Sequence, residues 1–267
     1  MSITIADIQS KKKQGRKITM LTAYDYSFAT LLDQAGIDII LVGDSVANVV
    51  LGLDSTKDVG IEQMLYHAKA VRRGVKQALI IGDMPFEALH GGVAKAVSCA
   101  KKFVKDAGCD AVKVEWFKDC LKVTRAILKA GIPVMGHVGL TPQTAEQLGG
   151  FKVQGKDEGS AKRILENAKA LEKVGCFSVV LECIPAPLAK LITEDLKIPT
   201  IGIGAGPDCS GQVLVTHDLL GLFDRYKPKF VKQYVHLAEN ILKGIKEFKS
   251  EVEEGIFPDS IHSYGKP

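Results

Sequence analysis

Residues 37–45 read IDIILVGDS, an aliphatic run that ends directly in Gly-Asp-Ser. A run that is apolar at successive positions predicts a strand buried on both faces, as in a parallel sheet covered on its two sides. The polar residues Asp44 and Ser45 follow at the strand's carboxyl end. An acid in that place is not needed for packing, so it indicates a functional site at the end of the strand.

Seven further segments have the same character. They are residues 17–24, 78–85, 110–116, 132–140, 177–185, 198–206 and 211–218. Segments with helical periodicity lie between most of them, at 26–36, 61–75, 93–108, 120–131, 158–175 and 186–196. Strands that alternate with helices over this length predict the α/β class and a closed (β/α)8 TIM barrel. The eighth strand has the least support, because no clear helix separates it from the seventh.

The ends of the chain add helices to the barrel. Residues 4–7 read TIAD, a capping-box pattern that predicts an N-terminal leading helix. From about Pro228 onward the periodicity predicts a C-terminal helical tail, packed on the outside of the barrel or in an oligomer contact. No shift in composition marks a linker, so we expect one barrel domain over residues 1–267.

Composition excludes several classes of protein. The chain is 46% apolar and 25% charged, and no apolar stretch approaches the roughly 20 residues that span a bilayer. The N-terminus lacks the pattern of a secretory signal, and the six cysteines lack metal-binding spacing. The net charge of +4 is too small and dispersed to indicate nucleic-acid binding. We expect a cytoplasmic enzyme with small-molecule substrates and neither nucleic acid nor membrane as a partner.

Three acids end neighbouring predicted strands: Asp44, Asp83 and Glu115. In a barrel of this type the strand carboxyl ends form the active site, so these carboxylates should converge. Carboxylates at close range repel each other unless a cation lies among them, and all-oxygen ligands suit Mg²⁺, with other divalent ions as substitutes. The alternative is that each acid caps the next helix or pairs with a surface lysine.

Lys113 lies two residues before Glu115, so both side chains share one face of the strand. If Glu115 points into the barrel mouth, Lys113 points into the barrel just beneath it. A lysine there could hold a substrate carboxylate or form a Schiff base, and the third interpretation is a buried ion pair without a ligand.

Glu182 ends the sixth predicted strand, across the barrel from the proposed metal group. A carboxylate there could take a proton from a bound substrate, although it could also cap the helix that follows. His137, at the end of the fifth strand, is either a substrate contact or a buried core histidine.

Residues 201–206 read IGIGAG after the seventh strand. This pattern lacks the third glycine and the downstream acid of a dinucleotide-binding fold, so that function is excluded. Two interpretations of these glycines stay open: they bind a phosphate group, or they let the backbone lie close to a flat substrate.

Motifs in order along nearly the whole chain carry a specific resemblance. They include VGDSVANVVLG, GDMPF, VKVE, GHVGLTPQ, LECIP, IGIGAG and GQVLVTHDLLG. The chain resembles the ketopantoate hydroxymethyltransferase family. The resemblance implies a TIM barrel and transfer of a hydroxymethyl group from 5,10-methylenetetrahydrofolate to 3-methyl-2-oxobutanoate. The product would be ketopantoate, formed by Mg²⁺-stabilised enolate chemistry in the first committed step toward pantothenate and coenzyme A.

The resemblance also implies roles for residues. Asp44, Asp83 and Glu115 correspond to the Mg²⁺ group, and Glu182 corresponds to the proton acceptor. Contacts to the 2-oxo acid are implied for Ser45 and Lys113, with Asp44, Asp83 and His137 also expected to line the substrate site. A homodecamer or another large homo-oligomer is implied for the assembled protein.

The chain departs from the family pattern at Trp116, Phe117 and Ser210, where relatives commonly have Gly-Gly and Asp. Three other functions compete with the one implied. They are a Mg²⁺-dependent lyase of 2-oxo acids that needs no folate, an aldolase with Lys113 as amine nucleophile, and a non-catalytic barrel.

Overall fold

The computed structural model describes residues 2–265, without the side chains of residues 147 and 148. The chain divides into two compact units, Met1–Val215 and Thr216–Pro267, which are described separately. The expectation of a single domain over the whole chain stays a prediction.

The first unit is a closed barrel of eight parallel strands. Each strand pairs with the next along the chain, and β8 closes the barrel on β1 with Ile18 opposite Gly211. The strands are β1 (Ile18–Thr22), β2 (Ile39–Val42), β3 (Leu79–Asp83), β4 (Ala111–Glu115), β5 (Val134–Gly139), β6 (Ser178–Glu182), β7 (Thr200–Ile203) and β8 (Gly211–Leu214). The predicted TIM barrel is confirmed, including its eighth strand.

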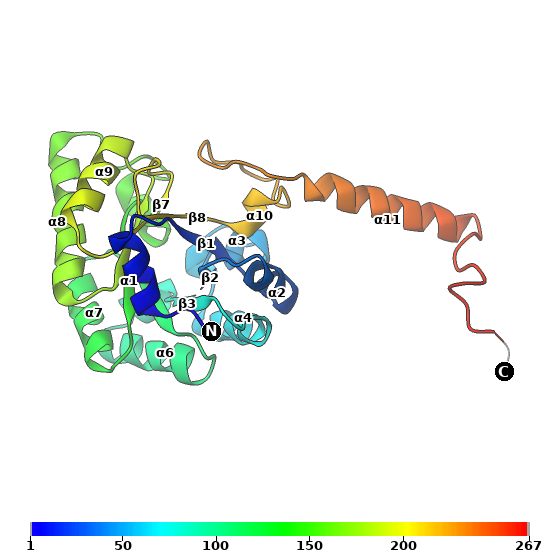
Figure 1. Cartoon of the computed structure of the whole chain (residues 1–267), viewed down its shortest axis with the longest axis horizontal. Helices are drawn as coiled ribbons and strands as arrows, with labels where there is room; N and C mark the ends of the chain where they lie inside the picture. The colour runs from blue at the N-terminus through cyan, green and yellow to red at the C-terminus, as the bar shows by residue number, and fades with distance from the viewer. Residues whose placement is uncertain (1, 266–267) are drawn as a thin grey trace. The chain divides into compact units, whose positions relative to one another are not determined.

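Helices surround these strands, as Figure 1 shows for the first unit. They are α1 (Ile5–Lys13), α2 (Tyr26–Gln34), α3 (Val46–Val49), α4 (Ile61–Gly74), α5 (Phe86–His90), α6 (Val93–Lys105), α7 (Cys120–Lys129), α8 (Glu158–Val174) and α9 (Ala186–Asp195), with 3₁₀ turns at η1 (Thr56–Asp58) and η2 (Pro142–Leu148). Apolar residues at helical spacing, such as Met64, Ala68 and Val71 of α4, are buried. Helix α4 therefore covers the outside of the sheet with one apolar face.

Side chains at alternate strand positions fill the barrel interior. Leu79 and Ile81 of β3 lie in one apolar cluster with Ala111 of β4 and Met135 of β5. Because side chains alternate along a strand, the next inward positions toward the carboxyl ends are Asp83, Lys113, Glu115 and His137. The barrel is thus apolar at its amino end and charged at its carboxyl end.

The leading helix α1 closes the amino end of the barrel. Thr4 and Asp7 form the predicted capping box, and Ile8 is fully buried in the interior cluster. Lys12 Nζ donates hydrogen bonds to the carbonyl oxygens of Thr193, Leu196 and Ile198 at 2.9, 2.6 and 2.8 Å. These bonds attach α1 to the end of α9 and the start of β7.

Backbone conformation and close packing explain two of the glycines in the IGIGAG segment. Gly204 and Gly206 adopt positive φ angles of 61° and 80°, which favour glycine. A Cβ on Gly206 would lie 2.4 Å from the Cβ of Ala186, at the start of α9. The glycines therefore let the turn after β7 pass close to α9.

The second unit contains α10 (Thr216–Leu219) and α11 (Leu237–Glu253). The predicted tail helix begins at Leu237 rather than near Pro228, and it has no buried residue. Across residues 2–265, none of the helices combines the length and apolar character needed to cross a membrane.

Candidate active site

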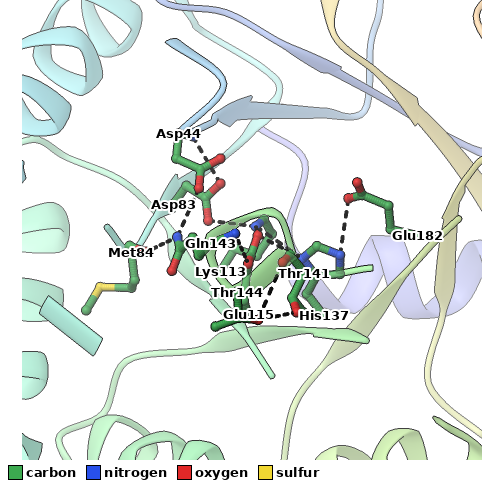
Figure 2. A network of polar contacts seen from close by, with 10 residues as sticks. All are labelled: Asp44, Asp83, Met84, Lys113, Glu115, His137, Thr141, Gln143, Thr144 and Glu182. Carbon is green, nitrogen blue, oxygen red and sulfur yellow. Dashed lines mark hydrogen bonds and ion pairs between the residues drawn. The ribbon is translucent and has the colours of Figure 1, made fainter. Parts of the chain in front are cut away.

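Strand register brings the predicted site residues together at the carboxyl end of the barrel. Asp83 of β3 lies opposite Lys113 of β4, and Glu115 of β4 lies opposite His137 of β5. Figure 2 shows these four side chains converging, with Asp44 beside Asp83 and Glu182 beyond His137. The cluster extends over the ends of five consecutive strands.

Lys113 is the centre of this cluster. Its side chain is 5% exposed, and its Nζ lies 2.8 Å from Asp83 Oδ1 and 3.4 Å from Glu115 Oε1. Burial opposes the charged form, but the carboxylates of Asp83, Glu115 and Asp44 outweigh burial and raise the pKa of Lys113. A permanently protonated amine is a poor nucleophile, so the structure disfavours the Schiff-base interpretation.

Asp44 lies just beyond the end of β2 and does not cap the helix that follows. Its backbone N–H donates to Asp83 Oδ2 at 3.1 Å, and its Oδ2 accepts from Gln143 Nε2 at 2.9 Å. Burial raises the pKa of Asp44, and the nearby charges of Asp83 and Glu115 raise it further. A cation near Asp44 and Asp83 would relieve this repulsion.

Glu115 and His137 form a buried pair that reaches toward Glu182. Burial opposes ionisation of Glu115, but Lys113 and His137 outweigh it and lower the pKa of Glu115 to about 2. Burial and the Lys113 ammonium oppose protonation of His137, but Glu115 and Glu182 raise the pKa of His137 to about 9. The raised pKa favours the imidazolium form of His137, whose Nδ1 lies 3.3 Å from Glu115 Oε1 and 3.5 Å from Lys113 Nζ.

Glu182 is the most accessible acid of the group. Its side chain is 17% exposed, and its Oε2 lies 3.2 Å from His137 Nε2. It does not cap α9, whose N-cap residue is Pro185. The arrangement leaves a carboxylate at the edge of the mouth that faces the buried cluster.

Close backbone packing fixes the position of Glu182. Its carbonyl oxygen accepts a hydrogen bond from Leu140 N–H at 2.9 Å. A Cβ on Gly139 would lie 2.2 Å from the same oxygen, and Gly139 has a φ of 99°. Cys183, the next residue, adopts a φ of 46°, which is uncommon for a residue other than glycine. The chain thus holds the candidate base through a constrained backbone.

Two contacts were not predicted from the sequence. Gln143, in η2 after β5, donates to Asp44 and also contacts Glu115; it is the last residue of the motif GHVGLTPQ, but no role was assigned to it because an isolated loop glutamine has no catalytic spacing pattern. Ser45 Oγ lies 2.8 Å from the Tyr24 hydroxyl, so Ser45 is held beside the first strand.

The three acids expected as metal ligands do not have equal freedom. Among residues 2–265, no group of three or more His, Cys, Asp and Glu side chains is arranged to hold a metal ion. Glu115 uses Oε1 for Lys113 and His137, and Oε2 for Gln143 N–H at 3.2 Å. Asp83 is also held, with Oδ1 2.8 Å from Lys113 Nζ and Oδ2 accepting from Asp44 N–H, but it lies directly beside Asp44, whose pKa is raised by burial and by the charges of Asp83 and Glu115. This oxygen-rich pair fits a hard divalent cation.

Trp116 and Ser210, two of the departures from the family pattern, lie outside the cluster, and the third, Phe117, packs against the His90 ring with 4.6 Å between ring centroids. Trp116 packs against the outer core, and its indole N–H is within 3.2 Å of the Asn167 amide of α8 when that amide is oriented to accept it. Ser210 exchanges hydrogen bonds with Thr200 at the amino ends of β7 and β8. Neither Trp116 nor Ser210 belongs to the polar network at the strand carboxyl ends.

Sequence comparison identifies relatives over nearly the full chain. Residues 2–260 match the family model described as ketopantoate hydroxymethyltransferase. The chain is 53% identical over 262 residues to a 3-methyl-2-oxobutanoate hydroxymethyltransferase of Moorella thermoacetica, covering 98% of this chain and 97% of the relative. A protein of the same name from Syntrophus aciditrophicus is 52% identical, with 98% and 96% covered.

Solved structures share the fold at low sequence identity. A phosphonopyruvate hydrolase, in complex with oxalate and Mg²⁺, gives a TM-score of 0.63 at 13% identity over 97% of this chain and 93% of that chain. A 2,3-dimethylmalate lyase gives 0.62 at 15% identity over 97% and 91%. These likenesses independently support the barrel architecture.

Proposed function

The chain belongs to the ketopantoate hydroxymethyltransferase family, and we propose that it transfers a hydroxymethyl group from 5,10-methylenetetrahydrofolate to 3-methyl-2-oxobutanoate. The observation that carries this proposal is the arrangement around Lys113. A buried cation and a pair of carboxylates lie on one side of His137, and Glu182 lies on the other. Such a site can hold a small 2-oxo acid beside a base.

A divalent cation, Mg²⁺ in our proposal, fits the residues at the Asp44 end of the cluster. Asp44 and Asp83 would hold it, because their oxygens are hard ligands and their mutual repulsion is only partly offset by Lys113. When bound, Mg²⁺ would supply a Lewis acid that stabilises negative charge developing on the substrate. Glu115 would keep its contacts to Lys113 and His137 rather than serve as a direct ligand.

The remaining residues would orient the substrate and move its proton. The ammonium of Lys113 would attract the substrate's negative charge, and Ser45 and His137 would border the same space. Glu182 would take the proton from C3 of the substrate, leaving an enolate whose carbon forms a bond to the methylene carbon of the folate. The bonds from that carbon to the folate nitrogens would break, tetrahydrofolate would leave with the protons, and water would supply the oxygen of the new hydroxymethyl group. The position of Glu182 at the accessible edge supports this role, since a base must reach a substrate that enters from outside.

Proton NMR of 3-methyl-2-oxobutanoate in D₂O tests the assignment of Glu182 as the base, because it follows the exchange of the C3 proton alone. With enzyme and Mg²⁺, the C3 proton signal should disappear, and a chelator should prevent its loss. Glu182→Gln should still bind the 2-oxo acid but leave the C3 signal intact. The exposed Glu146, 86% accessible, offers the matched control Glu146→Gln, which should exchange normally. Normal exchange in Glu182→Gln would exclude Glu182 as the base.

We also propose that the protein forms a large homo-oligomer, such as a homodecamer, in the cytoplasm. The support is α11, whose apolar residues Ile241, Ile245, Phe248 and Val252 share one helix face that the second unit itself leaves between 47% and 59% exposed. A face of this size normally needs a covering surface. Light scattering should give a multiple of the chain mass, and Ile245→Asp together with Phe248→Asp should lower it.

A further inference from the structure

Gln143 links three parts of the candidate site. Its side-chain Nε2 donates to Asp44 Oδ2 at 2.9 Å and to the Met84 carbonyl oxygen at 3.0 Å. Its backbone N–H donates to Glu115 Oε2 at 3.2 Å. Figure 2 shows the side chain between Met84 and the two neighbouring aspartates. One residue of the loop after β5 thus contacts residues at or just beyond the ends of β2, β3 and β4.

The side chain of Asp44 is fixed less firmly by the strands than those of Asp83 and Glu115. Asp83 and Glu115 are the last residues of their strands, so strand alternation directs their side chains into the barrel. Asp44 lies two residues beyond the end of β2, where no strand pairing fixes it. Its backbone N–H is held by Asp83, and its carboxylate is held by Gln143.

The orientation of the Gln143 amide is determined by its neighbours. Both groups facing Nε2 are acceptors, a carboxylate and a carbonyl oxygen, so a reversed amide would place oxygen against oxygen. In this orientation Oε1 is buried and has no hydrogen-bond partner among residues 2–265. The side chain is only 1% exposed. An apolar residue would avoid this unpaired oxygen, so the amide is explained better by its contact to Asp44 than by stability.

From these contacts we infer that Gln143 is a positioning residue for the divalent cation. It holds Asp44 Oδ2 from one side and thereby orients the carboxylate toward Asp83, where the cation would bind. This inference rests on the proposed function, because it assigns to Gln143 the task of shaping the proposed metal site. Contacts of this kind behind a metal ligand affect affinity, since they fix the ligand before the metal arrives.

The test measures Mn²⁺ binding by electron paramagnetic resonance, without substrate, in the full-length protein and two variants. Gln143→Met keeps the length of the side chain and the backbone contact to Glu115 but removes the amide. The control Thr144→Val removes the hydroxyl contact between Thr144 and Thr141, 2.6 Å long, in the same loop, and touches none of the three acids. Thermal unfolding of both variants compares their stability.

Gln143→Met should weaken Mn²⁺ binding about 10- to 100-fold, the range seen when such supporting contacts are removed. Thr144→Val should stay within about twofold of the unaltered protein, as expected for a change remote from the ligands. Equal Mn²⁺ affinity in Gln143→Met and the unaltered protein would overturn the inference. So would equal weakening in both variants, because that result would show a general effect of the loop.

Two further arrangements keep the outcome interpretable. If Gln143→Met does not fold, Gln143→Asn replaces it, because its amide is one methylene group too short to keep the contact to Asp44. The C3 exchange assay on the unaltered protein separates the two levels of the proposal. If Gln143→Met binds Mn²⁺ and exchanges the C3 proton as the unaltered protein does, only the positioning role is refuted. If the unaltered protein neither binds Mn²⁺ nor exchanges the C3 proton, the proposed function is refuted, and the positioning role with it.

Discussion

Lys113→Met should destabilise the barrel strongly, because it removes the cation around which the buried acids gather. Its Nζ lies 2.8 Å from Asp83 Oδ1 and 3.4 Å from Glu115 Oε1. Coulomb's law at an effective dielectric constant of about 20 gives gross attractions of about 6 and 5 kcal/mol for these contacts. Desolvation of the ammonium cancels part of this, and removing one partner of a buried pair typically costs about 3–5 kcal/mol. We expect a loss of that size at pH 7.

The loss should depend on pH in a defined direction. The folded pKa of Lys113 is raised, so the lysine is charged in both states below its unfolded pKa of about 10.4, and its contribution is constant between pH 5 and 8. In the variant, Asp44 keeps a raised pKa and Asp83 loses its partner. A carboxyl whose folded pKa is raised destabilises the fold as pH rises through that value. The deficit of Lys113→Met should therefore shrink as the pH is lowered from 8 to 5.

Urea unfolding measures this effect through the fluorescence of Trp116, the single tryptophan, which directly follows Glu115. Protein concentration must be equal in all samples, because assembly would add to apparent stability. Lys95→Met is the matched control, since the exposed Lys95–Glu87 pair should contribute at most about 1 kcal/mol. If Lys113→Met matched this control at pH 7, or its deficit grew toward pH 5, the proposed crowding of charged carboxylates would be wrong.

Three further predictions concern residues around the candidate site and at the amino end of the barrel. Gly139→Ala should lower the unfolding free energy by about 2 kcal/mol or more and impair C3 exchange, because its Cβ would lie 2.2 Å from the Glu182 carbonyl oxygen. Gly131→Ala is the control, because Gly131 also has a positive φ but no atom lies near the added Cβ, and it should lower the unfolding free energy by only about 1 kcal/mol. Equal losses of unfolding free energy in the two variants would contradict the steric argument for Gly139. Lys12→Met should lower the unfolding free energy by about 1–3 kcal/mol in the same assay, because it removes three hydrogen bonds to backbone carbonyl oxygens. An unchanged urea midpoint would show that these hydrogen bonds do not stabilise the fold. His137 has a folded pKa of about 9, above its unfolded value, so its stabilising charge is fully present below about pH 6.5 and is lost as pH rises through 9. The stability difference between the protein and His137→Gln should accordingly narrow between pH 7 and 10, and a constant difference would refute the raised pKa.

Much of the fold could be predicted because its signals are local. Residues 39–42 are apolar at successive positions, as expected for a strand covered on both faces, and the same pattern recurs around the barrel. The strand-end acids Asp83 and Glu115 follow from alternation within one strand, as does the placement of Lys113 beneath Glu115. The start of α11 was misplaced because periodicity continues through residues 228–236, although the chain there is not helical.

The sequence by itself therefore determined the barrel, the residues at its carboxyl end and the family, because these depend on patterns along the chain. Only the tertiary structure decided which of those residues touch. Gln143 reaches Asp44 across 99 positions of sequence, and His137 joins Glu115 to Glu182 through the register of three strands. Ion pairs and pKa values depend on distances of a few ångströms between residues remote in the chain, and those distances are fixed only when the barrel closes.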